Sequence, residues 1–284
     1  MAFKLTEDSY GKSAVRLTKV VRNGDFHELF EIEAAVQLQG DFEPAYTVGD
    51  NRQVIATDTI KNTVYVLAKE NAFTSIEQFA VLLARHFVAT YSQVHQAQVQ
   101  LLQSAWKRIA IDGKPHDHAF TSAGAHQRSA AATLDRGGKI SIVGGVRDLA
   151  VLKTTASEWR DFHTDRYRTL KDTSDRIIAT NINADWIFTT DTAEFNAAND
   201  AILKAISETF AIKHSLGVQQ TLVDMGQAAL AAAPMINSIS FELPNMHRIP
   251  FNLDPFGLKF DNDIYVATDE PYGLIKGIVT RDSQ

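Results

Sequence analysis

The pattern of apolar and polar positions predicts an antiparallel hairpin at the start of the chain. Apolar and polar residues alternate over Ser13–Val21 and again over His27–Leu38, as expected for strands that bury one face. The residues between them, Asn23-Gly24-Asp25, have the composition of a tight turn. The two segments should therefore pair with each other.

A helix and a third strand are predicted next. The sequence Thr74-Ser75-Ile76-Glu77 has the form of a capping box that starts a helix. Apolar residues then recur at helical spacing to about Tyr91, namely Ile76, Phe79, Leu83 and Phe87. Alternation returns over Val94–Ile111, which predicts a strand.

The second part of the chain repeats this mixture of strands and helices. An apolar stripe from Phe195 to Phe210 and the segment Val218–Ala232 predict two helices. The predicted strands are Lys139–Lys153, Asp185–Thr189, Ser238–Leu243, Ile264–Ala267 and Leu274–Thr280. Two similar halves with antiparallel strands and long helices define an α+β architecture. The polar segment Thr133–Gly138 separates them, so we divide the chain into residues 1–136 and 137–284.

Composition and charge remove several classes of function. Of the 284 residues, 45% are hydrophobic and 22% are charged, as in ordinary globular proteins, and the net charge of -6 argues against a nucleic-acid-binding surface. The absence of cysteine excludes disulfides, a thiol nucleophile and cysteine-ligated metals. The glycine motifs of dinucleotide and P-loop sites are also absent. With neither a signal peptide nor a membrane-spanning stretch in its sequence, the protein is expected to be cytoplasmic and not to bind membranes.

A metal site is the first chemical alternative. His116-Asp117-His118 combines two imidazoles with a carboxylate, which are suitable ligands for zinc or iron. No recognised motif supplies a third ligand, and a hydrogen-bonded loop or an interface pair of histidines explains the same residues. We therefore expect no metal.

Seven short strings, taken together and in order, resemble the urate oxidase (uricase) family. Each string alone is too short to identify a family, but their shared order covers nearly the whole chain. The strings are Tyr10-Gly11-Lys12, Val54–Tyr65, His116–Phe120, Val151–Thr155, Thr173–Ile177, Leu243–His247 and Pro271–Ile275.

This resemblance implies a fold, an assembly and a reaction. The fold is a tandem tunnelling fold (T-fold), with antiparallel sheets, helices on the outer face, and a barrel completed by oligomerisation. The assembly is a homotetramer with active sites at subunit interfaces. The family oxidises urate with molecular oxygen and water to 5-hydroxyisourate and hydrogen peroxide, and uses no metal or organic cofactor. Catalysis then consists of removing protons from an electron-rich purine and holding oxygen beside it.

The resemblance assigns a proton relay to Lys12, Thr57 and His247. A threonine hydroxyl is a poor base, so it needs a neighbour such as a desolvated lysine to accept its proton. Histidine exchanges protons near neutral pH and could connect the relay to water. Taken alone, each residue has a simpler explanation: a solvated strand lysine, a β-branched strand residue and a structural histidine.

Substrate binding is assigned to a second set of residues. The guanidinium of Arg176 and the amide of Gln219 suit the polar edge of a heterocycle. The other assigned contacts are Thr57, backbone groups of Asp58 and Val218, and Asn245, which would hold water or oxygen above the ring. The alternatives are an ion pair with the neighbouring Asp175, a helix cap at Gln219 and a turn at Asn245.

The sequence departs from the family at the residue expected to stack on the purine. The family has phenylalanine in a Ser-x-Phe string, whereas Ser157-Glu158 is followed here by Trp159. Indole also stacks on purines, so Trp159 is the predicted stacking residue, and Phe162 is its rival.

Two other functions stay open. One is a different purine- or pterin-handling enzyme on the same fold; such relatives often use zinc held by Cys and His, and this chain has no Cys. The other is a catalytically silent oligomer that only binds purine, which the change to Trp159 keeps open.

Overall fold

The computed structural model describes residues 3–282, which form two compact units. The first unit extends to Gly145 and includes Ile187–Ala197; the second comprises Val146–Trp186 and the residues from Ala198 onward. The described chain is a mixed α and β structure with long antiparallel strands and few helices. No helix among the described residues is long and apolar enough to cross a membrane.

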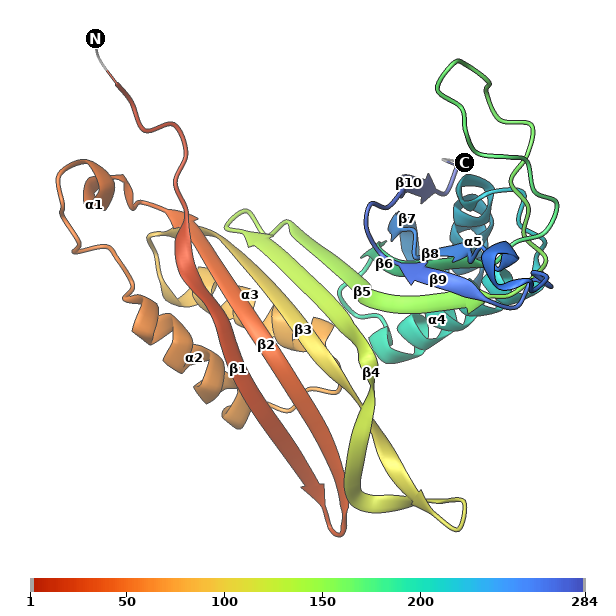
Figure 1. The fold of residues 1–284 in the computed structure, drawn as a ribbon. Helices are drawn as coiled ribbons and strands as arrows, with labels where there is room; N and C mark the ends of the chain where they lie inside the picture. The colour runs from red at the N-terminus through yellow and green to blue at the C-terminus, as the bar shows by residue number, and fades with distance from the viewer. Residues whose placement is uncertain (1–2, 283–284) are drawn as a thin grey trace. The chain divides into compact units, whose positions relative to one another are not determined.

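The first unit is built on four long strands in sequential order (Figure 1). They are β1 (Tyr10–Asn23), β2 (Phe26–Gly40), β3 (Val94–Ile111) and β4 (Lys114–Asp135). Each pairs antiparallel with the next, and the register Asn23↔Phe26 closes the predicted hairpin on its two-residue turn. Along β2, buried and half-buried residues alternate, which confirms the predicted two-residue periodicity.

Two helices bury their apolar stripes against one face of this sheet (Figure 1). They are α2 (Thr57–Glu70), which packs on β1, and α3 (Ile76–Thr90), which packs on β3 and β4; the short α1 (Glu43–Thr47) precedes them. The buried side of α2 is formed by Ile60, Val64, Leu67 and Ala68. The helix α3 and the strand β3 confirm the prediction, whereas α2 and β4 were not predicted.

The capping box of α3 lies one residue later than predicted. Ser75 is the N-cap, and its hydroxyl accepts from the backbone N–H of Gln78 at 3.2 Å. The side chain of Gln78 in turn accepts from the backbone N–H of Thr74 at 2.9 Å. Glu77 takes no part in the cap, because its side chain is fully buried and pairs with Arg128 on β4 at 2.9 Å.

This buried ion pair is the basis of a stability prediction. We expect Arg128→Ala to lower the free energy of unfolding by about 3 kcal/mol, because the buried Glu77 carboxylate then lacks the cation that compensates its charge. Arg85→Ala is the control, since Arg85 pairs with Asp191 while 57% exposed and should contribute less than about 1 kcal/mol. Urea denaturation measures both; equal losses would contradict the prediction.

The second unit contains most of β5 and β6 together with β7 and β10, in the sheet order β5, β6, β7, β10, and a separate small hairpin. The strands are β5 (Ile140–Lys153), β6 (Ile178–Phe188), β7 (Ile236–Pro244) and β10 (Leu274–Thr280), with β8 (His247–Pro250) and β9 (Tyr265–Thr268) in the hairpin. β7 and β10 pair antiparallel, and one 3-10 turn, η1 (Asp254–Phe256), follows β8. All five predicted strands are present, although β6 begins earlier than predicted.

The helices of this unit are α4 (Phe195–Ile212) and α5 (Val218–Ala232), and both were predicted. The stripe of α4 is buried, and the indole N–H of Trp186 on β6 donates to the side chain of Asn199 at 2.9 Å. α5 packs on β7 and β10. Its first residues are the ones that the sequence assigned to substrate binding.

Candidate functional site

The first unit holds the predicted residues Lys12, Thr57 and Asp58. Lys12 is half-buried on β1 beside a register shift between Lys12 and Val15. Thr57 begins α2 and is exposed, so it lies at a helix terminus and is not the strand residue of the simpler reading. The backbone N–H of Ile55 donates to the Tyr10 hydroxyl at 2.7 Å, which ties the start of β1 to the approach to α2.

Electrostatics connect Lys12 with this helix terminus. The pKa of Asp58 is lowered, first by its hydrogen bond and ion pair with Lys61, then by a hydrogen bond from Asn62 at 3.0 Å and by the charge of Lys12. β1, the strand that carries Lys12, also packs against α2. Because the Asp58 carboxylate is engaged by Lys61 and Asn62, its backbone N–H is the group left to contact a ligand.

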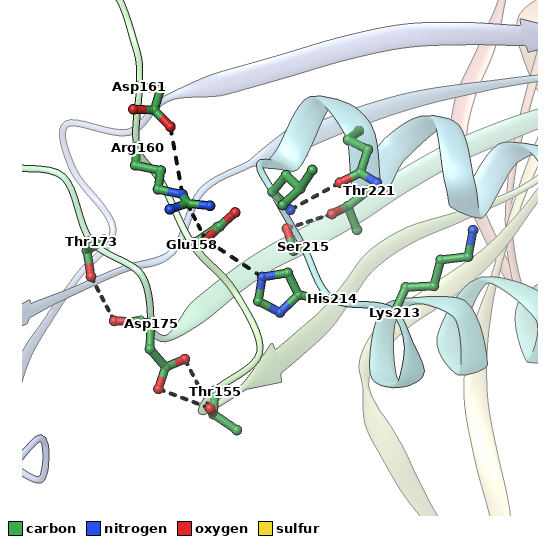
Figure 2. Close-up of polar contacts among 12 residues, drawn as sticks. Thr155, Glu158, Arg160, Asp161, Thr173, Asp175, Lys213, His214, Ser215 and Thr221 are labelled. Atoms are coloured by element: carbon green, nitrogen blue, oxygen red, sulfur yellow. Dashed lines mark hydrogen bonds and ion pairs between the residues drawn. The ribbon is translucent and has the colours of Figure 1, made fainter.

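The second unit holds Trp159, Arg176, Val218, Gln219, Asn245 and His247. Backbone pairs Ser157↔Ser215 and Trp159↔Thr173 fix the segment that carries Trp159. Figure 2 shows side chains that reinforce it: the Thr155 hydroxyl donates to the carboxylate of Asp175 at 3.0 Å, and the hydroxyls of Ser215 and Thr221 are 2.7 Å apart. The chain around the predicted stacking residue is thus held by hydrogen bonds.

Arg176 is half-buried and lacks the ion pair considered for it. Its backbone N–H donates to the carbonyl of Ser157 at 2.8 Å, and its guanidinium carbon lies 5.6 Å from the ring centroid of Trp159. Within residues 3–282, its Nε is buried with no hydrogen-bond partner. Burial lowers the pKa of Arg176. A buried donor with no protein acceptor is available for a ligand.

Trp159, Phe162 and the start of α5 adjoin Arg176. The rings of Trp159 and Phe162 are stacked, with centroids 5.5 Å apart and planes at 15°. A Cβ on Gly217 would meet Trp159 Cζ3 at 2.8 Å and the side-chain oxygen of Gln219 at 3.4 Å, so these residues are close neighbours. The two candidates for stacking on the purine, Trp159 and Phe162, therefore belong to one aromatic stack.

Both helices that carry predicted binding residues begin without a side-chain cap. Ala56 precedes α2 and Gly217 precedes α5, and neither position provides a capping side chain. The first N–H groups of a helix have no acceptor within the helix. The backbone N–H groups of Thr57 and Asp58, and those of Val218 and Gln219, are therefore donors suited to carbonyl or anionic groups of a ligand.

Asn245 and His247 lie where β7 continues into β8. The backbone of Asn245 bridges to Thr180 and donates to the carbonyl of Gly273 at 2.9 Å. Its side-chain oxygen is buried, and no partner for it exists in the part of the chain that the structure describes. His247 is the first residue of β8 and is half-buried. Asn245 thus resembles Arg176, because each has a buried polar side-chain atom with no hydrogen-bond partner among the described residues.

The histidines of the metal alternative lie on β4 of the first unit. The rings of His116 and His118 have centroids 4.6 Å apart, and His118 is 5.6 Å from His27 on the neighbouring hairpin. Over residues 3–282 no group of three His, Asp or Glu side chains has a geometry that could hold a metal ion. These imidazoles contact one another instead.

Three residues beside the predicted ones were not assigned a role from the sequence. Tyr10 holds the residues before α2 through Ile55, and burial raises the pKa of its hydroxyl. Gly217 approaches Trp159 closely, and Ser157 buries a hydroxyl that has no partner among the described residues. Tyr10 and Ser157 both stood in strings that were compared with the family, whereas Gly217 carried no such signal.

The described chain thus combines mixed α and β units, two uncapped helix starts, and buried polar side-chain atoms that have no partner among residues 3–282. The sequence model of the uricase family, described as "Uricase", matches residues 8–133 and 142–276. A uricase from Arthrobacter globiformis is 40% identical over 278 residues, which are 98% of this chain and 90% of that protein. A uricase from Dictyostelium discoideum is 34% identical over 98% of this chain and 97% of its own.

Solved structures agree with these relationships. The crystal structure of the uricase from Arthrobacter globiformis has a TM-score of 0.94 at 39% identity, and covers 100% of this chain and 97% of that one. A uricase from Bacillus fastidious, at 19% identity, has a TM-score of 0.85 and shares the fold. This chain belongs to the uricase family.

Proposed function

We propose that this protein oxidises urate with molecular oxygen and water to 5-hydroxyisourate and hydrogen peroxide. The membership of the uricase family carries this proposal. The reaction balances, because urate loses two electrons, oxygen gains them with two protons to become peroxide, and water supplies the hydroxyl that joins the purine at C5. No cofactor is needed to transfer the electrons, since the urate anion is itself the reductant.

The proposed binding residues divide into ring and edge contacts. Trp159 stacks on the purine, while Arg176 and Gln219 bind its carbonyl and ring nitrogen edge. The N–H groups of Val218 and Asp58, with Thr57, bind the remaining polar edges. The unpaired Nε of Arg176 and the two uncapped helix starts support this assignment, because each offers donors that the protein leaves unused.

The proposed catalytic residues are Lys12, Thr57 and His247. Lys12 accepts a proton from urate through the hydroxyl of Thr57, and His247 connects this relay to water. The packing of β1, which carries Lys12, against α2, which begins at Thr57, supports the first step. Asn245, whose side-chain oxygen is buried without a partner among the described residues, is proposed to hold water or oxygen over the ring.

The assembly proposed for this activity is a homotetramer of T-fold subunits, with helices outside a shared barrel. Each active site then combines residues from neighbouring subunits, so the monomer would be inactive. The division of the chain into residues 1–136 and 137–284 and a cytoplasmic location belong to the same proposal. Light scattering of the active protein tests the tetramer, since a monomeric active species would contradict it.

We expect chelator-treated protein to oxidise urate at an undiminished rate. Loss of the ultraviolet absorbance of urate and release of hydrogen peroxide, followed together, measure the reaction. One peroxide should form for each urate consumed. If chelation abolished turnover and an added metal restored it, the cofactor-free reaction would be wrong; if urate bound without reacting, the protein would be a silent purine-binding oligomer.

A further inference from the structure

Gly217 makes an unusually close approach to the indole of Trp159. A Cβ at this position would lie 2.8 Å from Cζ3 and 3.2 Å from Cε3 of the six-membered ring. Carbon atoms in van der Waals contact are separated by about 3.5–4.0 Å, so a methyl group cannot be added without displacement. The backbone does not demand glycine, because a φ of 167° is extended and open to any residue.

The backbone on both sides of this contact is held in place. Trp159 and Thr173 exchange two backbone hydrogen bonds of 2.9 Å, and the neighbouring Glu158 N–H donates to Ser215 at 2.8 Å. The carbonyl of Gly217 accepts from the backbone N–H of Thr221 at 3.1 Å and from its hydroxyl at 3.0 Å. Neither chain segment can move away without losing these bonds, so the indole ring itself must move.

We propose that Gly217 is a positioning residue that seats the larger ring of Trp159, so that glycine and tryptophan form a matched pair setting the width of the urate pocket. The inference rests on the proposed function. Phe162 already stacks on the indole, and Arg176 lies 5.6 Å from its centroid. An added methyl group displaces the indole within this crowded set, and disturbs the ring and edge contacts to the purine together.

If Gly217 and Trp159 form a matched pair, Gly217→Ala should weaken urate binding only when Trp159 is present. Gly217→Ala should raise the dissociation constant of urate about tenfold, because residues in direct contact are strongly coupled. Trp159→Phe replaces two fused rings by one and leaves room for the methyl group. In that background, Gly217→Ala should change the dissociation constant by less than about twofold.

Equilibrium dialysis with urate under nitrogen measures binding without turnover in the wild type, the two single variants and the double variant. In air, Gly217→Ala should raise KM about tenfold while kcat stays within about threefold, since binding and not the proton relay is disturbed. Gly226→Ala is the control. It overpacks the same helix against Val279, 2.5 Å from the added Cβ, and should leave urate binding unchanged.

Two results would overturn the pairing of Gly217 with Trp159. One is wild-type affinity for urate in Gly217→Ala. The other is an equal loss of affinity whether residue 159 is tryptophan or phenylalanine. If Gly217→Ala fails to fold, recovery of folding in the double variant supports the pairing, and failure of both rejects it. Near-ultraviolet circular dichroism tests the contact without purine: Gly217→Ala should alter the spectrum only when Trp159 is present. If wild-type protein binds urate but releases no peroxide, the proposed reaction is wrong. The effect of Gly217→Ala on urate binding can still be compared between the Trp159 and Trp159→Phe proteins.

Discussion

Lys12→Met is expected to reduce kcat for urate oxidation by about 10²- to 10⁴-fold and to leave the urate dissociation constant within about threefold. The half-buried Lys12 lies on β1, which packs against α2, the helix that Thr57 begins. A proton relay acts on the barrier and not on the bound ground state, so its removal should appear in kcat. Peroxide release at saturating urate measures kcat, and dialysis under nitrogen measures binding.

The control is Arg16→Met on the same strand. Arg16 is 80% exposed and pairs with Glu33, so its loss removes a surface charge without touching the relay. Thr57→Ala should behave as Lys12→Met does, and the double variant should be no slower than the worse single variant, because residues of one relay act as a unit. Losses that multiply would show that Lys12 and Thr57 act independently.

Most of the strands, although not β4 or β8, and three of the long helices could be predicted because their signals are local. The alternation in β2 and the stripe of α3 each follow from burial of one face, which the sequence records directly. The cap of α3 was ambiguous, since Thr74 with Glu77 and Ser75 with Gln78 fit the same motif. Glu77 is buried and pairs with Arg128, which is distant in sequence, so Glu77 is not available for a cap. The cap is Ser75, whose hydroxyl accepts from the N–H of Gln78.

The helix α2 could not be predicted because its local signals oppose it. Its sequence is rich in β-branched residues, including Thr57, Ile60 and Val64, which favour strands. Its N-cap Ala56 supplies no capping side chain. What makes it a helix is burial of its apolar stripe against β1, a tertiary effect that overrides propensity. The missing cap is also what leaves the N–H groups at Thr57 available.

The sequence could name candidate residues for the site but not their geometry. The family resemblance named Arg176 and Asn245, yet nothing in the sequence indicates that both bury an unpaired polar atom. Gly217 carried no signal at all, because the need for glycine arises from Trp159, far away along the chain. Such requirements become visible only when the two segments are seen side by side.

Arg176→Gln is expected to weaken urate binding about 100-fold, or about 3 kcal/mol, because it removes charge-assisted hydrogen bonds to the purine edge. Stability should respond differently. Within the described chain the Nε of Arg176 is buried without a partner, and burial lowers its pKa, so the folded protein disfavours the charged form. At a pH below the lowered pKa of Arg176, the folded protein contains this buried charge, so Arg176→Gln should not reduce the melting temperature.

Arg166→Gln separates this expectation from a general effect of losing an arginine. Arg166 lies in the same segment, is exposed and contacts the exposed side chain of Tyr167, so its replacement should change neither urate binding nor stability by much. Loss of the contact between Arg176 and Trp159 opposes the gain from removing a buried charge, which limits any rise in melting temperature. A lower melting temperature with unchanged urate binding would make Arg176 a structural residue. Weaker binding at equal or greater stability is the behaviour of an arginine retained for its ligand.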